Sequence, residues 1–576
     1  MKRFKIAVLS GAAVAVVFLV QAVAQGPKDL PTVIQSGATK QALELIRGGA
    51  DVNQTQGDGS SPLLWAINRS DYEVAEALLA KKANPNAGNE FGALPLTEAA
   101  RLNDARMVKM LMDAGAKVDS ANPDDETVLM LAIKNGNQAM VETLVGAGAK
   151  VNIIEKFHNQ TPLMYAASAG RPEMVKLLLS KGADVKPRAL YTDWPSQVTS
   201  EPRVQYRSVG GLNALMYAIR GGCYACVEQL MAAGADINFP TPEGITPLML
   251  ALDNEHNEVA KLLMDKGAYL DVWDWWGRTP LWIAVDRKAP PAATGGGGGG
   301  FGGGPGAAKG GGPGAAKGGA GGGKGGGFGG GGRGAPAAGA ALTAAGTAIT
   351  PVTSMQLINT LLEAGANPNV EMNFHRPNAP NRGRFGDNQV STGTTALFRA
   401  VQLNDLEVAE ALLKRGANPN INSMGYTAWG IAAGASPAGR GGALGGPMNM
   451  ALLDLLTKNG GDVNAKVSGT MSYSFHTGYN NPTDGVNSKE GSTALHEAAR
   501  VGQAELVKYL LDHGADPNLL DADGQKPMDV VGKVREAPAP AGAKGKGGPR
   551  GGGVSQAALA EIRTLLQGTP AKPVSR

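Results

Sequence analysis

The stretch that decides the fold is NQTPLMYAASAGRPEMVKLLLSKGADV, residues 159–185. Thr161 is a good N-cap for a helix, and Pro162 suits the first helical position, where its missing N–H costs nothing. A Gly-Arg-Pro break follows, and apolar residues at helical spacing over 174–178 predict a second helix. Gly182 stands where a left-handed C-terminal cap is needed. Because one such pair cannot bury its own apolar face, it must stack on copies of itself as a solenoid.

Copies of this unit recur along the chain at a nearly constant period. The small pair that closes the second helix occurs first at Gly49-Ala50, and the next four closing pairs follow at steps of 33, 33, 33 and 34 residues. Later closing pairs begin at Gly234, Gly267, Gly365, Gly416, Gly460 and Gly514. We count about twelve units over residues 28–567, so the sequence predicts one long all-α solenoid.

The repeated motifs resemble those of the ankyrin repeat family. The starting motif occurs as Thr161-Pro162-Leu163 and Thr246-Pro247-Leu248, and the closing motif as Ala183-Asp184-Val185, Ala235-Asp236-Ile237-Asn238 and Ala515-Asp516-Pro517-Asn518. The resemblance covers most of the chain and implies an ankyrin-repeat α-solenoid, with helix–turn–helix units joined by hairpin fingers. In this family the fingers and first helices line the concave face that binds partners. The resemblance therefore implies a non-enzymatic scaffold for protein–protein interaction, whose partner the sequence does not identify.

The first 24 residues have the pattern of a secretory signal peptide. A basic start, MKRFK, precedes an apolar run over 6–20, and Ala22-Val23-Ala24 fits the small-x-small cleavage pattern. The alternative is an uncleaved membrane anchor, although the apolar run is short for a span. We expect cleavage after Ala24 and an exported bacterial protein, periplasmic or secreted, with no membrane span in its mature form.

The charge of the chain is close to balanced. The formal net charge is +4, and Lys2, Arg3 and Lys5 supply three of these charges, so the mature chain is near +1. This charge is too small for bulk attraction to nucleic acid or anionic lipid, and we expect no nucleic-acid partner. We also expect a monomer.

Composition divides the chain into five parts. They are a signal peptide (1–24), an N-terminal array (28–288), a Gly/Ala/Pro-rich insert (289–350), a C-terminal array with inserts (351–567) and a disordered tail (568–576). The insert interrupts a single repeat, because the step from Gly267 to Gly365 is 98 residues, about 65 more than the period. Its composition predicts disorder. We interpret it as a tolerated linker, with a basic arm for a polyanion as the alternative.

The only two cysteines form the motif Cys223-Tyr224-Ala225-Cys226. They stand at the entry to a second helix, where a helix N-terminus lowers a thiol pKa, and the motif invites a redox interpretation. However, Cys226 aligns with Val175 of the opening stretch, which is a core position. We favour a structural core thiol or a local disulfide, and the alternative function is that of a redox or stress-related accessory protein.

Three tryptophans mark one finger, at Trp273, Trp275 and Trp276. Because exposed tryptophan is a typical interface anchor, we hypothesise that these three residues bind the protein partner. The alternative is that they pack on neighbouring fingers. A secreted effector or inhibitor that blocks a foreign protein is a further possibility for the same fold.

No catalytic constellation emerges from the remaining residues. The six histidines are scattered without metal-ligand spacing, and neither G-x-S-x-G nor H-E-x-x-H occurs. We therefore expect no enzymatic activity, no cofactor and no metal site.

Overall fold

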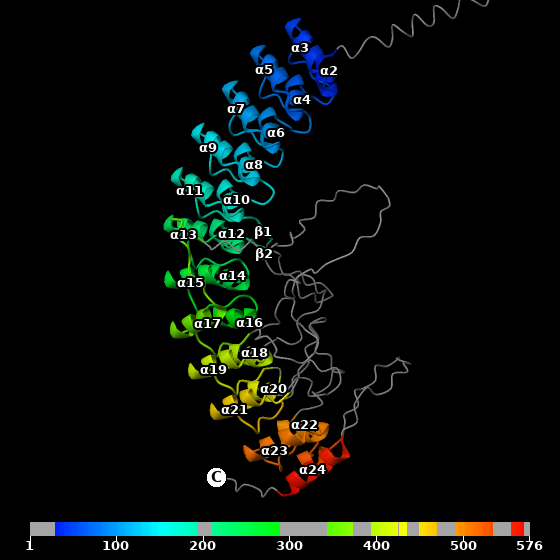
Figure 1. Ribbon diagram of the computed structural model, residues 1–576, viewed down its shortest axis with the longest axis vertical. Coiled ribbons are helices and arrows are strands. Elements are labelled where there is room, and N and C mark those ends of the chain that lie inside the picture. The colour runs from blue at the N-terminus through cyan, green and yellow to red at the C-terminus, as the bar shows by residue number, and fades with distance from the viewer. Residues whose placement is uncertain are drawn as a thin grey trace, which may run out of the picture.

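The structure is a computed structural model that describes residues 29–192, 209–288, 342–372, 393–423, 425–434, 449–468, 491–533 and 555–568. The predicted signal peptide (1–24), most of the predicted insert (289–341) and most of the predicted tail (569–576) lie outside the described residues. The described helices stack in pairs along one axis and form a long bow (Figure 1).

Each pair contributes one inner helix on the concave side of the bow and one outer helix on the convex side (Figure 1). The inner helices are α2 (Leu30–Ser36), α4 (Pro62–Asn68), α6 (Pro95–Arg101), α8 (Val128–Asn135), α10 (Pro162–Ser168), α12 (Ala214–Gly221), α14 (Pro247–Asp253), α16 (Pro280–Arg287), α18 (Ala396–Gln402), α20 (Ala428–Ala432) and α22 (Ala494–Val501). The outer helices are α3 (Thr39–Arg47), α5 (Tyr72–Ala80), α7 (Ala105–Asp113), α9 (Gln138–Gly146), α11 (Pro172–Ser180), α13 (Tyr224–Ala232), α15 (Asn257–Asp265), α17 (Ser354–Glu363), α19 (Leu406–Lys414), α21 (Met450–Lys458) and α23 (Ala504–Asp512).

The last unit departs from this pattern. A short 3-10 helix, η1 (Pro527–Val530), takes the place of its inner helix, and α24 (Gln556–Gln567) takes the place of its outer helix. With this unit the described residues contain the repeated helix pairs that the sequence predicts, and the all-α solenoid is confirmed.

The opening stretch shows why each unit begins and ends where it does. Thr161 Oγ1 accepts the Met164 N–H at 3.3 Å, and Pro162 is the first residue of α10. The side chains of Leu163 and Ala166 are fully buried. The small alanine lets neighbouring inner helices approach closely, and Gly182 ends the unit at a φ of +80°, as predicted.

The asparagine of the closing motif holds successive units in register. Asn369 Nδ2 donates to the Gly416 carbonyl at 2.9 Å, and Asn369 Oδ1 accepts the Asn418 N–H at 2.7 Å. The same pair of hydrogen bonds links Asn420 to the carbonyl of Gly460 and the N–H of Asp462, each at 2.8 Å. Because both spans include inserts in the sequence, the ladder continues across units that these inserts interrupt.

The stretch 289–341 falls between α16 and α17, the two helices of one unit, and three ion pairs hold its two sides together. Asp286 Oδ1 lies 2.7 Å from Arg399 Nε, and Lys288 Nζ lies 2.9 Å both from Asp405 and from Glu407. We call these five residues the clamp. Their pairing joins the end of α16 to α18 and α19, so the array continues as one stack past the interruption.

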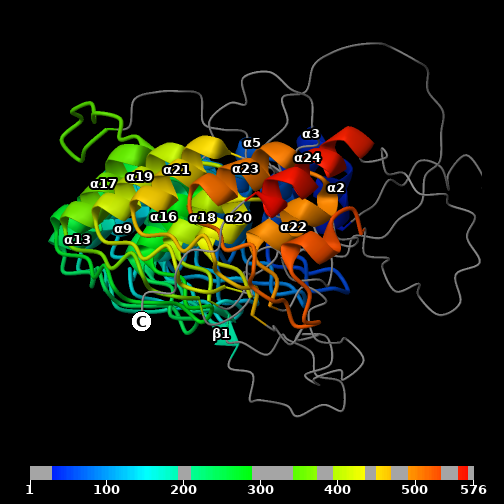
Figure 2. The same cartoon turned by 90° about the horizontal axis from the view of Figure 1, so that it is seen from below.

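The fingers, which are the loops from each outer helix to the next inner helix, form a layer beside the helices (Figure 2). One of them contains a short antiparallel pair, β1 (Tyr191–Thr192) and β2 (Val209–Gly210), in which Tyr191 pairs with Gly210. Among the residues that the structure describes, none of the helices is both long and apolar enough to cross a bilayer.

Candidate interaction site on the fingers

The finger that follows α15 carries the predicted tryptophans, and we call residues 268–278 the Trp finger. Two hydrogen bonds fix it against the preceding finger. The Trp275 N–H donates to the Glu243 carbonyl at 2.8 Å, and the Tyr269 N–H donates to Asn238 Oδ1 at 2.8 Å. The tip of the Trp finger therefore has a defined backbone position.

A buried carboxylate organises the turn of the Trp finger. Asp274 Oδ1 accepts the N–H groups of Trp276 and Arg278 at 3.0 Å and 2.9 Å, and Asp274 Oδ2 pairs with Arg278 Nε at 2.7 Å. Arg278 also contacts Asp253 through both terminal nitrogens, at 3.1 Å and 2.9 Å. These two carboxylates raise the pKa of Arg278, although burial alone would lower it. The guanidinium thus stays charged and anchors the finger to α14.

Two of the three tryptophans reach the surface. Trp273 is 62% exposed and Trp275 is 53% exposed. Tyr269, on the same finger, is 61% exposed. Burying such side chains against a partner removes much apolar area from water, so Trp273, Trp275 and Tyr269 form the candidate contact surface.

Trp276 does not belong to this surface, which corrects the sequence hypothesis. Its side chain is only 7% exposed, and the Arg278 guanidinium lies 5.2 Å from its ring centroid. The reason is that Trp276 is the second residue after the buried Asp274, where the turn directs the chain back toward α16. Trp276 therefore packs in the core of the array and supports the finger.

The preceding finger adds another exposed ring. Phe239 is partly exposed, and the Arg188 guanidinium lies 4.6 Å from its centroid. The same guanidinium lies 5.7 Å from the ring of Tyr191. Cation–π contacts of this kind restrain aromatic side chains at a surface, so this finger is also ordered beside the Trp finger. The sequence does not reveal these residues as a group, because their proximity arises only when units stack.

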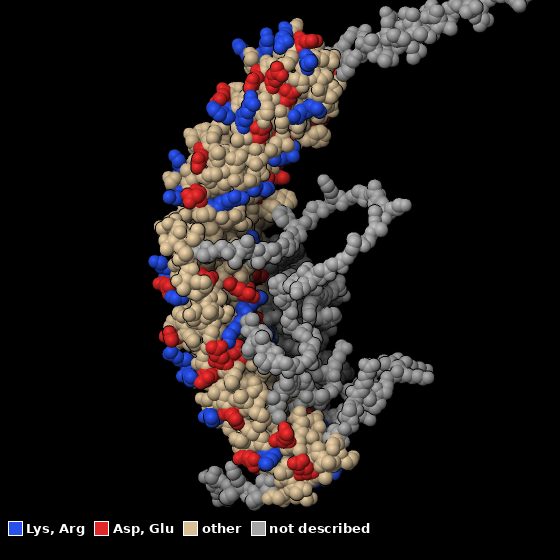
Figure 3. Space-filling model, viewed as in Figure 1, with Lys and Arg blue, Asp and Glu red and all other residues tan. Residues whose placement is uncertain are grey.

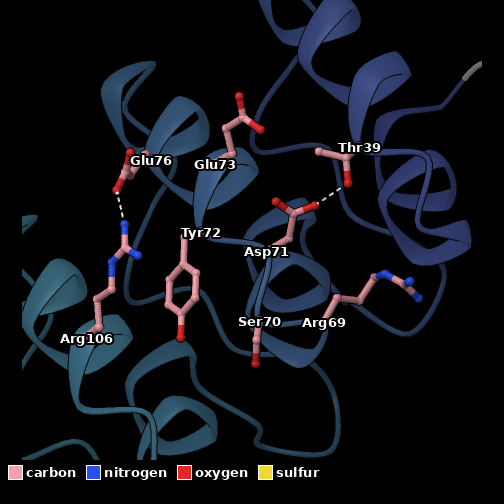
Figure 4. A pocket seen from close by; sticks show the side chains of 8 residues that line it. All are labelled: Thr39, Arg69, Ser70, Asp71, Tyr72, Glu73, Glu76 and Arg106. Atoms are coloured by element: carbon pink, nitrogen blue, oxygen red, sulfur yellow. Dashed lines mark hydrogen bonds and ion pairs between the residues drawn. The ribbon is translucent and has the colours of Figure 1, made fainter.

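A hollow on the described surface lies elsewhere, between the turns of the first three units (Figure 4). It measures roughly 540 Å³, and its lining residues are Thr39, Arg69, Ser70, Asp71, Tyr72, Glu73, Glu76 and Arg106. Two contacts link its lining residues: Thr39 Oγ1 donates to Asp71 at 2.6 Å, and Arg106 lies 3.2 Å from Glu76. A hydrogen bond to Asp104 raises the pKa of Tyr72, so this phenol is a poor base or nucleophile. The hollow offers no catalytic arrangement.

The surface charges are also mixed. On the face that Figure 3 shows, Lys and Arg lie in small groups among Asp and Glu along the whole array. Within the residues that the structure describes, no three His, Cys, Asp or Glu side chains gather in a way that could hold a metal ion.

The two cysteines lie at the turn between α12 and α13, and the structure joins them by a disulfide. Cys223 is the N-cap of α13 and is partly exposed, whereas Cys226 is fully buried. The predicted correspondence of Cys226 with Val175 is wrong by one residue. Cys226 is the third residue of α13 and corresponds to Met174 of α11, whereas Val227 corresponds to Val175. All four of these side chains are buried in the core of the array.

Family models of ankyrin repeats match most of the described array. A model of three ankyrin repeats matches residues 32–122, 117–189 and 215–293. A model of many ankyrin repeats matches 484–531, and a single ankyrin repeat matches 392–423. Together these matches cover more than half of the chain, and the helix pairs and the asparagine ladder account for them. The chain belongs to the ankyrin repeat family, whose members are generally non-enzymatic modules for protein–protein interaction.

Relatives in animals share parts of this array. The chain is 33% identical over 138 residues to a Danio rerio protein named as the palmitoyltransferase ZDHHC13, which covers 24% of this chain and 18% of that protein. It is 32% identical over 125 residues to the human ankyrin repeat and KH domain-containing protein 1, and the match covers 21% of this chain and 4% of that protein. It is 28% identical over 151 residues to the B-cell lymphoma 3 protein homolog of Mus musculus, and the match covers 23% of this chain and 34% of that protein. The chain thus spans about a third or less of each relative.

Proposed function

We propose that this protein is an exported bacterial scaffold that binds a protein partner through the Trp finger. The observation that carries the proposal is the exposure of Trp273 and Trp275 on a finger that a buried ion pair holds in place. Tryptophan is over-represented among the residues that dominate binding free energy at interfaces. The partner contacts the two indole rings and Tyr269, while neighbouring fingers and inner helices supply the surrounding surface.

The rigidity of the finger matters as much as its exposure. Association costs the free energy of ordering mobile side chains and loops, and a preformed surface reduces that cost. In the Trp finger, Asp274 and Arg278 fix the turn, and Trp276 fills the space beneath it. Binding therefore needs little rearrangement of the scaffold.

The experiment begins with the mature protein as bait in an extract of the cell envelope, followed by identification and purification of what it captures. Affinity for the purified partner is then measured for the double variant Trp273→Ala, Trp275→Ala. The matched control is Phe91→Ala, which removes a 73% exposed ring from a different finger. We expect the double variant to bind at least ~30-fold more weakly, as hot-spot residues do, and the control to bind like the wild type.

An equal loss in both variants would show that the Trp finger has no special role. Unchanged affinity of the double variant would refute its role as the binding surface. Because both variants remove only exposed side chains, we expect both to retain the helical fold, and circular dichroism checks this.

The export part of the proposal rests on residues 1–24 and is tested separately. Expression of the full chain in a bacterium and N-terminal sequencing of the product should give Gln25 as the first residue of protein recovered outside the cytoplasm. Recovery of uncleaved chain in the cytoplasm alone would contradict export and leave the binding surface unaffected.

A further inference from the structure

The turn between α12 and α13 carries the Cys223–Cys226 disulfide, a group that no other described turn has. Elsewhere the N-cap of the outer helix is often a carboxylate or an amide whose oxygen accepts the N–H of the third helical residue. Asp71 does this for Val74 at 3.2 Å, and Asp104 does it for Met107 at 2.9 Å. In α13 the acceptor is the sulfur of Cys223, 3.3 Å from the Cys226 nitrogen.

The two sulfur atoms of this disulfide are not equivalent. Cys223 is partly exposed at the turn, whereas Cys226 has no exposed surface and packs among the core residues of α13. Since an attacking thiolate must approach one sulfur directly, only Cys223 can be reached while the unit stays folded. Cys226 is then the sulfur that leaves.

The position at the helix start also distinguishes Cys223 after reduction. The first N–H groups of α13 point toward the cap, and the helix macrodipole favours negative charge there. A thiolate at Cys223 would keep the hydrogen bond from the Cys226 N–H, as the carboxylates of Asp71 and Asp104 keep theirs. A helix N-terminus with a second cysteine three residues later is the environment in which a cysteine thiol becomes acidic.

We propose that Cys223 and Cys226 form a thiol–disulfide exchange site that accepts two electrons from a dithiol while the array stays folded. This activity is independent of partner binding at the Trp finger. The structure favours exchange at Cys223 over a purely structural disulfide because the bond lies at a turn, with one cysteine partly exposed and the other fully buried.

The exchange balances as two displacements. One thiol of the dithiol loses its proton and attacks Cys223 Sγ, so the Cys223–Cys226 bond breaks and Cys226 leaves as a thiolate that takes up a proton. The second thiol of the dithiol then loses its proton and attacks the dithiol's own sulfur in the mixed disulfide. This step releases Cys223 as a thiolate, which takes up the second proton. The dithiol ends as a disulfide, and two electrons and two protons have moved to the protein.

The first test uses the mature wild-type protein and dithiothreitol as the dithiol, with alkylation and mass spectrometry to count reduced cysteines. The rate of reduction is measured in water and at urea concentrations well below the unfolding transition. If exchange occurs in the folded state, the rate of reduction should be proportional to the dithiothreitol concentration and nearly independent of the urea concentration. A rate that rises steeply with urea would show that the bond reacts only after unfolding, and the proposal would fail.

The second test compares single variants designed on the other units. Cys226→Val leaves Cys223 as a free thiol and places in the core the residue that Val74 and Val259 supply in α5 and α15. Cys223→Asp restores the carboxylate cap and leaves Cys226. At neutral pH we expect the free thiol of Cys226→Val to react with a small chromogenic disulfide at least ~100-fold faster than that of Cys223→Asp. Equal rates would overturn the assignment of Cys223 as the exchanging sulfur.

The combined variant Cys223→Asp, Cys226→Val is the control for folding. It keeps the cap and the core packing but has no sulfur, so it should retain the helical signal and the melting behaviour of the wild type. It should also bind the partner of the Trp finger normally, whereas the Trp273→Ala, Trp275→Ala variant should exchange disulfides normally. The two proposals can therefore fail separately.

Discussion

The guanidinium of Arg278 forms two hydrogen bonds with the carboxylate of Asp253, 3.1 Å and 2.9 Å long, and these bonds tie the Trp finger to the inner helix of the unit before it. The same side chain is paired with Asp274 and is only 4% exposed. Arg278 thus couples the shape of a surface loop to the stacking of two units.

Removing this side chain should destabilise both the finger and the array. In Arg278→Met, Asp274 remains buried without its cation, and we expect the free energy of unfolding to fall by about 3–5 kcal/mol. The control is Arg287→Met, because Arg287 also contacts Asp253 but is 44% exposed, and its loss should cost less than about 1 kcal/mol. Urea unfolding measures both, and equal effects would contradict the role of burial.

Lys82 should be a site of strain. It occupies the closing position that glycine fills in other units, with a φ of +66°. This left-handed conformation costs a residue with a side chain about 1–2 kcal/mol, so Lys82→Gly should raise the free energy of unfolding by roughly 1 kcal/mol.

The reverse substitution, Gly115→Lys, provides the control. Gly115 has a φ of +89°, and a Cβ atom there would meet no atom within 4 Å, so only backbone strain opposes a side chain. Gly115→Lys should therefore lower the free energy of unfolding by a similar amount. If Lys82→Gly is less stable than the wild type in thermal unfolding, side-chain contacts of Lys82 outweigh the strain.

The last units should lose stability in mild acid because of His496. Burial lowers the pKa of His496 below the usual 6.5. The Thr493 N–H donates to His496 Nδ1 at 3.2 Å, and His496 Nε2 lies 3.0 Å from the Gln525 carbonyl oxygen. Both contacts suit the neutral ring with its proton on Nε2, which donates to that carbonyl. Between 6.5 and the lowered pKa the unfolded chain binds more protons than the folded chain, so stability falls as pH decreases through that window.

Hydrogen exchange in α22 at several pH values measures this effect. Protection should decrease below pH 6.5, beyond the intrinsic change in exchange rate, and His496→Gln should be less stable at neutral pH but much less sensitive to acid in this window. An equal pH dependence in wild type and variant would assign the effect to other groups.

The clamp should keep the array in one piece after the chain is cut. If an engineered protease site within 289–341 is cleaved, we expect the two fragments to sediment together, because Asp286, Lys288 and their partners lie on opposite sides of the cut. In the cut protein, Lys288→Met with Arg399→Met should weaken the association at least ~100-fold, since each change removes the cation that faces a buried carboxylate. Unchanged association would mean that apolar packing of α16 against α17 and α18 is sufficient.

Helix caps and glycine spacing made the fold predictable from the sequence. Thr161, Pro162 and Gly182 act locally, through hydrogen bonds and backbone angles within one unit, and the structure places them as the sequence implies. A period close to 33 residues then requires stacking, because no single unit can bury its apolar face. The same local logic identified the Trp finger, since fingers follow directly from the ends of outer helices.

Only the tertiary structure decided which of the finger residues are accessible. Trp275 and Trp276 are neighbours in the chain, yet one is exposed and the other buried, because the turn around Asp274 sends successive side chains to opposite sides. The pairing of Arg278 with Asp253 and of Asp286 with Arg399 joins residues 25 and 113 positions apart. Such contacts depend on how units stack, in the second case across an interrupted repeat, and local periodicity does not specify this stacking.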